Sequence, residues 1–175
     1  MPMKACAYVV GPSDGPGAGL LDMGRELGFP LVLPFQSVAA AEAQSRQTPL
    51  LFFLFAAVTD VRILKGVADQ IRFAPTRRIR FSPLLYFSES PSRDAISRCI
   101  EMGFDDVITL PFTRPRLLRR LTRLVDHTQV YHETAGYLGP ERPIHRGSGQ
   151  FRRLEIIRTT ATGTSVLRDE MRVGL

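Results

Sequence analysis

Short apolar runs alternate along the chain with segments in which apolar residues recur at helical spacing. The apolar runs have the length of buried strands and cover residues 4–10, 30–34, 50–55, 84–87 and 107–109. The segments with helical spacing follow them, at residues 20–27, 38–43, 61–71, 90–100 and 114–129. This alternation predicts an α/β fold, with a doubly wound, five-stranded parallel sheet and helices on both faces.

Local signals refine this arrangement. The run at 50–55 is apolar on both faces and is therefore predicted to be a central strand, whereas the prolines in 30–34 favour an edge strand. Ser90-Pro91 supplies a cap and a first-turn proline for the fourth helix. Thr113 is predicted to cap the fifth helix.

The pattern weakens in the last part of the chain. We therefore divide the sequence into a main domain, residues 1–130, and an irregular C-terminal tail, residues 131–175. Within the tail we expect an edge strand at 151–160 and a short helix at 165–173. Because both are too small to fold alone, the tail must pack on the domain, exchange with a second copy, or become ordered on a partner.

Several functional classes are disfavoured by composition. No apolar run reaches the roughly eighteen residues of a membrane span, and the N-terminus lacks a long signal-peptide core. Cys6 and Cys99 lie in apolar contexts without metal-ligand spacing. His127, His132 and His145 are scattered along the sequence. We therefore expect buried free thiols, a cytoplasmic protein, no membrane contact, and no metal or other cofactor.

Positive charge is concentrated in one part of the sequence. Basic and acidic side chains balance in residues 1–113 and again in residues 159–175, so the whole formal net charge of +6 lies in residues 114–158. An anionic partner is therefore sought first on the predicted fifth helix and the adjoining tail.

Residues 103–112, Gly-Phe-Asp-Asp-Val-Ile-Thr-Leu-Pro-Phe, combine a helix end, a short strand and a Pro-Phe corner. This segment resembles the Gly-Ala-Asp-Asp-Tyr-Leu-Thr-Lys-Pro-Phe motif of the receiver domain of two-component response regulators. Residues 84–88 resemble that family's fourth strand and residues 49–55 its third. The likeness extends over residues 3–130 and implies a flavodoxin-like (βα)5 fold.

The chemistry of that family requires groups that are missing at the matching positions. Phosphorylation needs a nucleophilic Asp, an acidic pair that binds Mg²⁺, and a Lys that neutralises the phosphoryl oxygens. The resemblance places the nucleophile at Phe55, or at Leu54 if the register slips by one residue. It places the acidic pair at Gly11 and Pro12, and the Lys at Leu110. The sequence therefore resembles a degenerate receiver, a pseudo-receiver without catalytic residues.

A few polar residues remain near this edge. Ser88 keeps the type of the family's switch hydroxyl, but it could equally bond only to local backbone. Asp14 and Asp60 are either solvated loop residues or a relocated phosphoacceptor or weak cation site. We further expect Phe55 and Leu110 to form an apolar plug, each contributing about 1.5–3 kcal/mol if fully buried.

The resemblance also implies a homodimer, because receivers commonly pair through the fourth helix, fifth strand and fifth helix. An arginine at 114 or 116 would then meet an acidic residue of the second copy. The alternative is that the basic residues of the predicted fifth helix only form a solvated face. The predicted interaction face comprises Glu101, Asp105, Asp106, Arg114, Arg116, Arg120 and Arg123.

Together these features favour a non-enzymatic signalling module in a bacterial two-component phosphorelay. It would act by protein–protein interaction without conventional phosphorylation, as a homodimer that contacts a histidine kinase or another signalling protein. The alternative is a nucleic-acid-binding regulator that uses the basic fifth helix and tail. No helix-turn-helix, zinc module or aromatic RNA platform supports that alternative.

Overall fold

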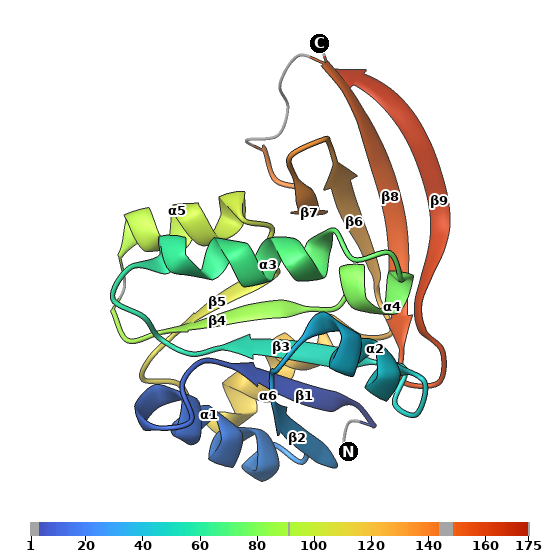
Figure 1. Cartoon of the computed structure of the whole chain (residues 1–175). Helices are drawn as coiled ribbons and strands as arrows, with labels where there is room; N and C mark the ends of the chain where they lie inside the picture. The colour runs from blue at the N-terminus through green and yellow to red at the C-terminus, as the bar shows by residue number, and fades with distance from the viewer. Residues whose placement is uncertain (1–3, 91, 144–148, 175) are drawn as a thin grey trace.

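A parallel sheet forms the centre of the main domain. The computed structural model describes residues 4–90, 92–143 and 149–174. The sheet contains β1 (Cys6–Val10), β2 (Leu31–Pro34), β3 (Leu51–Phe55), β4 (Leu84–Ser88) and β5 (Asp106–Thr109). Neighbouring strands run parallel in the order β2-β1-β3-β4-β5 (Figure 1). The predicted doubly wound, flavodoxin-like α/β fold is therefore confirmed, including the edge position of the second strand.

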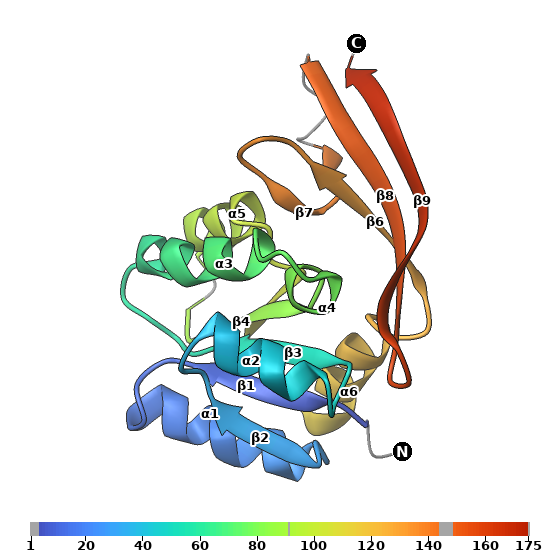
Figure 2. The ribbon, with the colours of Figure 1, turned by 45° about the vertical axis from the view of Figure 1, so that its right-hand side comes forward.

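Helices cover both faces of this sheet (Figures 1 and 2). They are α1 (Gly15–Glu26), α2 (Val38–Ser45), η1 (Val61–Leu64), α3 (Lys65–Arg72), α4 (Arg77–Arg80), α5 (Arg93–Glu101) and α6 (Arg114–Thr122). Helices α1 and α6 contribute Leu20 and Leu117 to the core on one face. The other helices cover the opposite face, where Ala68 and Cys99 are fully buried.

Strand β3 shows how the sequence builds both cores. Successive side chains of a strand point to opposite faces of the sheet. Phe52 and Leu54 therefore join the core under α1 and α6, while Phe53 and Phe55 join the core on the other face. All four are fully buried. A central parallel strand thus needs the continuous apolar run found here.

The C-terminal part forms a second, antiparallel sheet. Its strands are β6 (Thr128–Glu133), β7 (Leu138–Pro140), β8 (Gly149–Thr159) and β9 (Gly163–Gly174), in the order β7-β6-β8-β9. The prediction of an irregular tail is therefore wrong. The boundary expected after residue 130 also falls inside β6.

Three further predictions for the end of the chain are wrong. Residues 165–173 form part of β9 rather than a helix, because pairing with β8 along the whole strand overrides the local preference. The strand expected at 151–160 exists, but it lies between β6 and β9 instead of at an edge. The fifth helix, predicted to reach residue 129, ends at Thr122, and residues from 128 onward enter β6.

The antiparallel sheet packs against the amino ends of β4 and β5. Phe81, which precedes β4, is buried together with Tyr131 of β6, and their rings meet edge to face at 5.6 Å between centroids. Close backbone contact continues this interface: a Cβ on Gly139 would lie 2.6 Å from the Cα of Gly103. The tail thus packs on the domain, which was one of the three options left open by its size.

Smaller features complete the comparison. Helix α5 begins at Arg93 and is capped by Ser92, so the start predicted at Ser90-Pro91 is too early; Pro91 itself lies outside the described residues. The Thr113 hydroxyl caps α6, as predicted. Cys6 and Cys99 are buried free thiols, and burial raises the pKa of each to about 12. No helix in the described part of the chain is long and apolar enough to cross a membrane.

Candidate functional site

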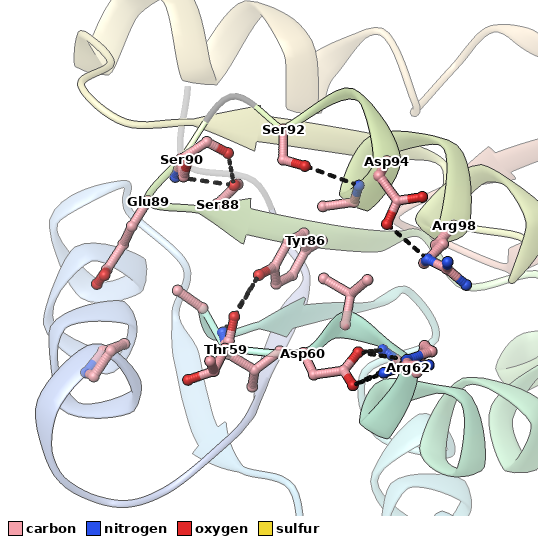
Figure 3. A pocket seen from close by; sticks show the side chains of 15 residues that line it. Thr59, Asp60, Arg62, Tyr86, Ser88, Glu89, Ser90, Ser92, Asp94 and Arg98 are labelled. Carbon is pink, nitrogen blue, oxygen red and sulfur yellow. Dashed lines mark hydrogen bonds and ion pairs between the residues drawn. The ribbon is translucent and has the colours of Figure 1, made fainter.

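A cavity of about 690 Å³ opens at the carboxyl ends of β3 and β4. This is the edge at which α/β sheets of this kind usually bind ligands. Figure 3 shows the loop after β3 on one side, the start of α5 on the other, and Tyr86 between them. The lining mixes hydroxyl groups with three acidic side chains (Asp60, Glu89 and Asp94) and two basic ones (Arg62 and Arg98), so its chemistry depends on how those charges are used.

Four of the five charged side chains of this cavity form two ion pairs, and the carboxylate of Glu89 belongs to neither pair. Asp60 accepts hydrogen bonds from Arg62, with an ion-pair distance of 2.7 Å. Asp94 pairs with Arg98 at 2.8 Å, one helical turn away on α5. Hydrogen bonding from Arg62 lowers the pKa of Asp60 to about 2, so that carboxylate is ionised and already occupied at neutral pH.

The hydroxyl groups are also engaged locally. Ser88 donates to the backbone oxygen of Ser90 and accepts from its backbone N–H, which matches the interpretation of Ser88 as a strand-end residue. The Tyr86 hydroxyl accepts from the backbone N–H of Val58 at 3.3 Å. These contacts shape the loops around the cavity instead of presenting a free nucleophile.

Ala56 and Phe55 belong to cores on opposite faces of the sheet at the end of β3. A Cβ on Gly11 would lie 2.7 Å from the Cβ of Ala56, so the side chain that adjoins the end of β1 is Ala56. Phe55 points to the other face, where it meets Phe104 with 4.8 Å between ring centroids. A difference of one residue along a strand changes the face, so Phe55 does not adjoin Gly11.

The predicted apolar plug of Phe55 and Leu110 is also wrong. Phe55 is fully buried, whereas Leu110 is 42% exposed. Leu110 borders a separate hollow with Phe87 and Phe112, whose side chains belong to the core under α1 and α6. The two side chains therefore lie on opposite faces of the sheet, and only that of Phe55 is buried in the core.

The remaining candidates do not assemble a metal site. Pro12 and Asp14 are exposed, and Asp14 precedes α1 without making a side-chain cap. His127 is exposed, whereas His132 stacks on Phe151 at 4.2 Å. His145 lies outside the described residues. Across residues 4–90, 92–143 and 149–174, no group of three or more His, Cys, Asp or Glu side chains could hold a metal ion.

The predicted interaction face is divided by the structure. Asp105 is buried inside the molecule, with a side chain only 1% exposed, so it cannot meet a partner's arginine. Asp106 pairs with Arg120 of the same chain at 2.7 Å. The exposed members are Glu101, Arg114, Arg116 and Arg123. Within the described part of the chain these three arginines form no ion pair, so the face is basic rather than mixed in charge.

Asp105 belongs to a buried polar cluster that sequence analysis did not predict. Its carboxylate pairs with Arg72 at 2.7 Å and with Arg158 at 3.1 Å, and it accepts hydrogen bonds from the backbone N–H of Leu84 and from the Tyr131 hydroxyl. The side chains of both arginines are at most 1% exposed. We refer to Arg72, Asp105, Tyr131 and Arg158 as the buried cluster.

Electrostatics within the buried cluster favour the ionised carboxylate. Burial alone would raise the pKa of Asp105, but the nearby charges of Arg158 and Arg72 outweigh it, so the pKa lies below its ordinary value. Burial raises the pKa of Tyr131 to about 12, which keeps its hydroxyl protonated as a donor. Two arginines therefore share one carboxylate, and further guanidinium N–H groups donate to the backbone oxygens of Gly103 and Phe81.

The sequence contains a faint signal for this cluster. Arg158 continues the alternation of Leu154 and Ile156, two buried residues of β8, and so falls on the inner face of its strand. Arg72 follows Ile71 and lies one helical turn after Ala68, both fully buried. Charged residues at apolar positions indicate buried partners, but the pattern cannot say which carboxylate they meet.

Comparisons with known proteins were made for the whole chain. No family model and no curated protein matches it. Among solved structures, it is similar to a response regulator in red light signaling of R. palustris, with 14% sequence identity and a TM-score of 0.43. The match covers 67% of this chain and 90% of that chain. Similarity at this level carries no argument about the activity of the chain.

Proposed function

We propose that the chain is a cytoplasmic, non-catalytic receiver-like module of two-component signalling that acts by binding proteins and is not conventionally phosphorylated. One observation carries this proposal. At the carboxyl edge of the sheet, Gly11 lies beside Ala56, Pro12 follows it, and Leu110 occupies the corner after β5. These side chains offer neither a nucleophile, nor oxygen ligands for Mg²⁺, nor a cation for phosphoryl oxygens.

The charges that remain nearby support the same proposal. A relocated phosphoacceptor would need a free carboxylate beside a bound cation. Asp60 is held by Arg62, and Asp94 is held by Arg98. Glu89 is the one acid of the cavity outside these two pairs, and no basic side chain of the cavity is left beside it to act as the cation. An ionised carboxylate that already accepts several hydrogen bonds is a poor nucleophile, because attack on phosphorus would first have to break them.

The surface of α6 suggests the kind of partner. Arg114, Arg116 and Arg123 are exposed and free of ion pairs with other described residues. Such a surface fits an acidic patch on a histidine kinase or another signalling protein, with charge steering the encounter. Asp105 and Asp106 are already used inside the chain, so Glu101 is the one predicted acidic partner left for the symmetric pairing.

The proposal is tested by exposing the full chain to acetyl phosphate, and separately to beryllofluoride, in the presence of Mg²⁺. Intact mass spectrometry and ¹⁹F NMR should show no carboxyl adduct, while a conventional receiver treated in parallel should be modified. Asp14→Asn, Asp60→Asn and Glu89→Gln serve as matched variants. An adduct on the wild-type chain that disappears in one of them would show a relocated phosphoacceptor and contradict the proposal.

Nucleic acid is the second candidate, favoured by the same unpaired arginines of α6. It predicts binding to generic DNA that weakens steeply as salt is raised. The arginines of the tail support it less, since Arg152 and Arg153 form ion pairs with nearby acids. A mobility shift over a salt series, with Arg116→Ala compared with Arg152→Ala, separates the two: retarded DNA and a larger loss in Arg116→Ala would favour nucleic acid.

A further inference from the structure

The outer edge of the antiparallel sheet is open. Strand β9 spans 12 residues, contains no proline, and pairs only with β8 among the described residues. Figures 1 and 2 show β9 as the outermost strand of a hairpin that projects beyond the parallel-sheet domain. An exposed edge of this length presents unpaired backbone N–H and C=O groups that can pair with another strand.

The exposed side chains of β9 are unusual for a solvated edge. Met171 is 62% exposed and Val173 is 68% exposed, although both are apolar. They alternate with Glu170 and Arg172, which pair with each other on the other face of the strand at 2.8 Å. Edge strands that are protected from association are usually short, interrupted by proline, charged, or bent by a β-bulge. The second half of β9 is neither short nor interrupted, its charges are of both signs, and the register shift of the strand lies before it, between Val166 and Arg168.

The sequence of β9 is complementary to itself in one register. In antiparallel pairing about a twofold axis at Met171, the two methionines face each other and Glu170 of each copy lies opposite Arg172 of the other. Axes at the three neighbouring positions are worse, because each brings two like charges face to face. Those axes lie at Asp169, Glu170 and Arg172.

We propose that β9 pairs antiparallel with β9 of a second copy, about a twofold axis at Met171, so that two antiparallel sheets become one continuous sheet. The pairing satisfies the open backbone edge and covers Met171. It also places two Glu170–Arg172 pairs between the copies, one on each side of the axis. A second copy fits better here than on α6, because β9 carries both signs of charge whereas the exposed part of α6 is basic. The inference stands independently of the proposed function, since it concerns a different surface.

The first test measures the self-association of the full chain by sedimentation equilibrium. We expect a reversible dimer of the 19.5 kDa chain at micromolar concentrations. Arg172→Glu and Glu170→Arg each place like charges opposite each other twice, and each should weaken the dimer roughly tenfold or more. The double variant with both changes restores opposite charges across the axis and should recover the dimer.

Control measurements keep this test decisive. Arg116→Glu makes the same change of charge on α6 and should leave the dimer unchanged. Thermal unfolding of each variant shows whether the protomer is intact, which matters because Arg153 lies opposite Glu170 on β8. A wild-type chain that stays monomeric at 100 µM, or a dimer lost in Arg116→Glu but kept in Arg172→Glu, would overturn the proposal.

A second test identifies the register directly. Residues directly opposite in antiparallel strands have Cα atoms roughly 4.5–5.5 Å apart, within the range that a disulfide spans. Met171→Cys should therefore give a covalent dimer under oxygen with a copper–phenanthroline catalyst, while Asp169→Cys, which faces Val173, should not. The native thiols at Cys6 and Cys99 are fully buried and do not interfere. A covalent dimer in Asp169→Cys alone would exclude the proposed register.

Discussion

The two ends of the parallel sheet differ in how they use charged side chains. At the carboxyl edge, Gly11, Ala56 and Leu110 are small or apolar, and Asp60 and Asp94 pair with adjacent arginines. At the amino ends of β4 and β5, the buried cluster holds two arginines and one carboxylate out of contact with solvent. The carboxyl edge is the usual site of chemistry in such folds, whereas the amino end usually serves stability.

This difference shows that a residue that matches a sequence motif need not lie on the surface. Asp105 matches the motif that carried the resemblance to receivers, and from sequence it seemed available to a partner. In the structure it joins α3 and β5 to two strands of the antiparallel sheet. These buried ion pairs therefore connect the parallel sheet to the C-terminal sheet.

The largest loss of stability is expected for Asp105→Ala, which removes the carboxylate of the buried cluster. The change leaves the guanidinium groups of Arg72 and Arg158 buried without a carboxylate, which should cost about 3–5 kcal/mol in the free energy of unfolding. Urea unfolding followed by circular dichroism measures it. Asp106→Ala is the matched control, because its pair with Arg120 is partly exposed and should be worth about 1 kcal/mol or less. Equal losses in the two variants would show that burial of the cluster is unimportant.

At the carboxyl edge, alanine substitutions of Phe55 and Leu110 should differ sharply in their effect on stability. Phe55→Ala removes a fully buried ring in contact with Phe104, and we expect a loss of about 3–5 kcal/mol. Leu110→Ala removes a side chain that is 42% exposed and should change stability by about 1 kcal/mol or less. Thermal unfolding compares the two. A large loss in Leu110→Ala would restore the idea of a shared apolar plug.

Tyr131→Phe tests the hydroxyl within the buried cluster. The change keeps the ring against Phe81 but removes a donor to Asp105, and it should cost about 1–3 kcal/mol. Tyr86→Phe is the control at the other edge, where the hydroxyl makes only long contacts to Val58. That variant should lose about 1 kcal/mol or less. The comparison fails if Tyr86→Phe is the more damaging change in urea unfolding.

The smallest effect is expected for Leu110→Lys, which introduces the charge that receivers carry at this corner. Because the side chain is partly solvated, stability should change by about 0.5 kcal/mol or less. The variant should also remain unresponsive to beryllofluoride, since the carboxylates are still missing. Leu117→Lys, at a fully buried position of α6, is the contrasting control and should prevent stable folding.

The parallel-sheet domain could be predicted because its signals are local. Each strand of the first sheet is a short apolar run, and the cap at Thr113 and the central position of β3 follow from a few neighbouring residues. The tail was predicted less well, since β9 carries the mixed charges of an exposed strand. Its extended form depends on pairing with β8, and no single-segment preference reveals that pairing.

Part of the candidate site could likewise be predicted from sequence, and part could not. The apolar character of Gly11, Pro12 and Leu110 could be read from residue types alone, although the side chain beside Gly11 proved to be Ala56 and not Phe55. The buried cluster could not be predicted from sequence, because Asp105 lies 33 positions from Arg72 and 53 from Arg158. Only the fold brings such distant residues together, so Asp105 was assigned to the surface.

The close approach of Gly103 and Gly139 has a consequence for the integrity of the chain. Their backbones touch with no room for a side chain, and the polar contacts of Asp105 lie beside them. A truncation after residue 130 would cut through β6 and expose Phe81, Arg72 and Asp105 to water at once. The two sheets are therefore expected to unfold in one cooperative transition, so that loss of the tail would also reduce the cellular lifetime of the receiver-like domain.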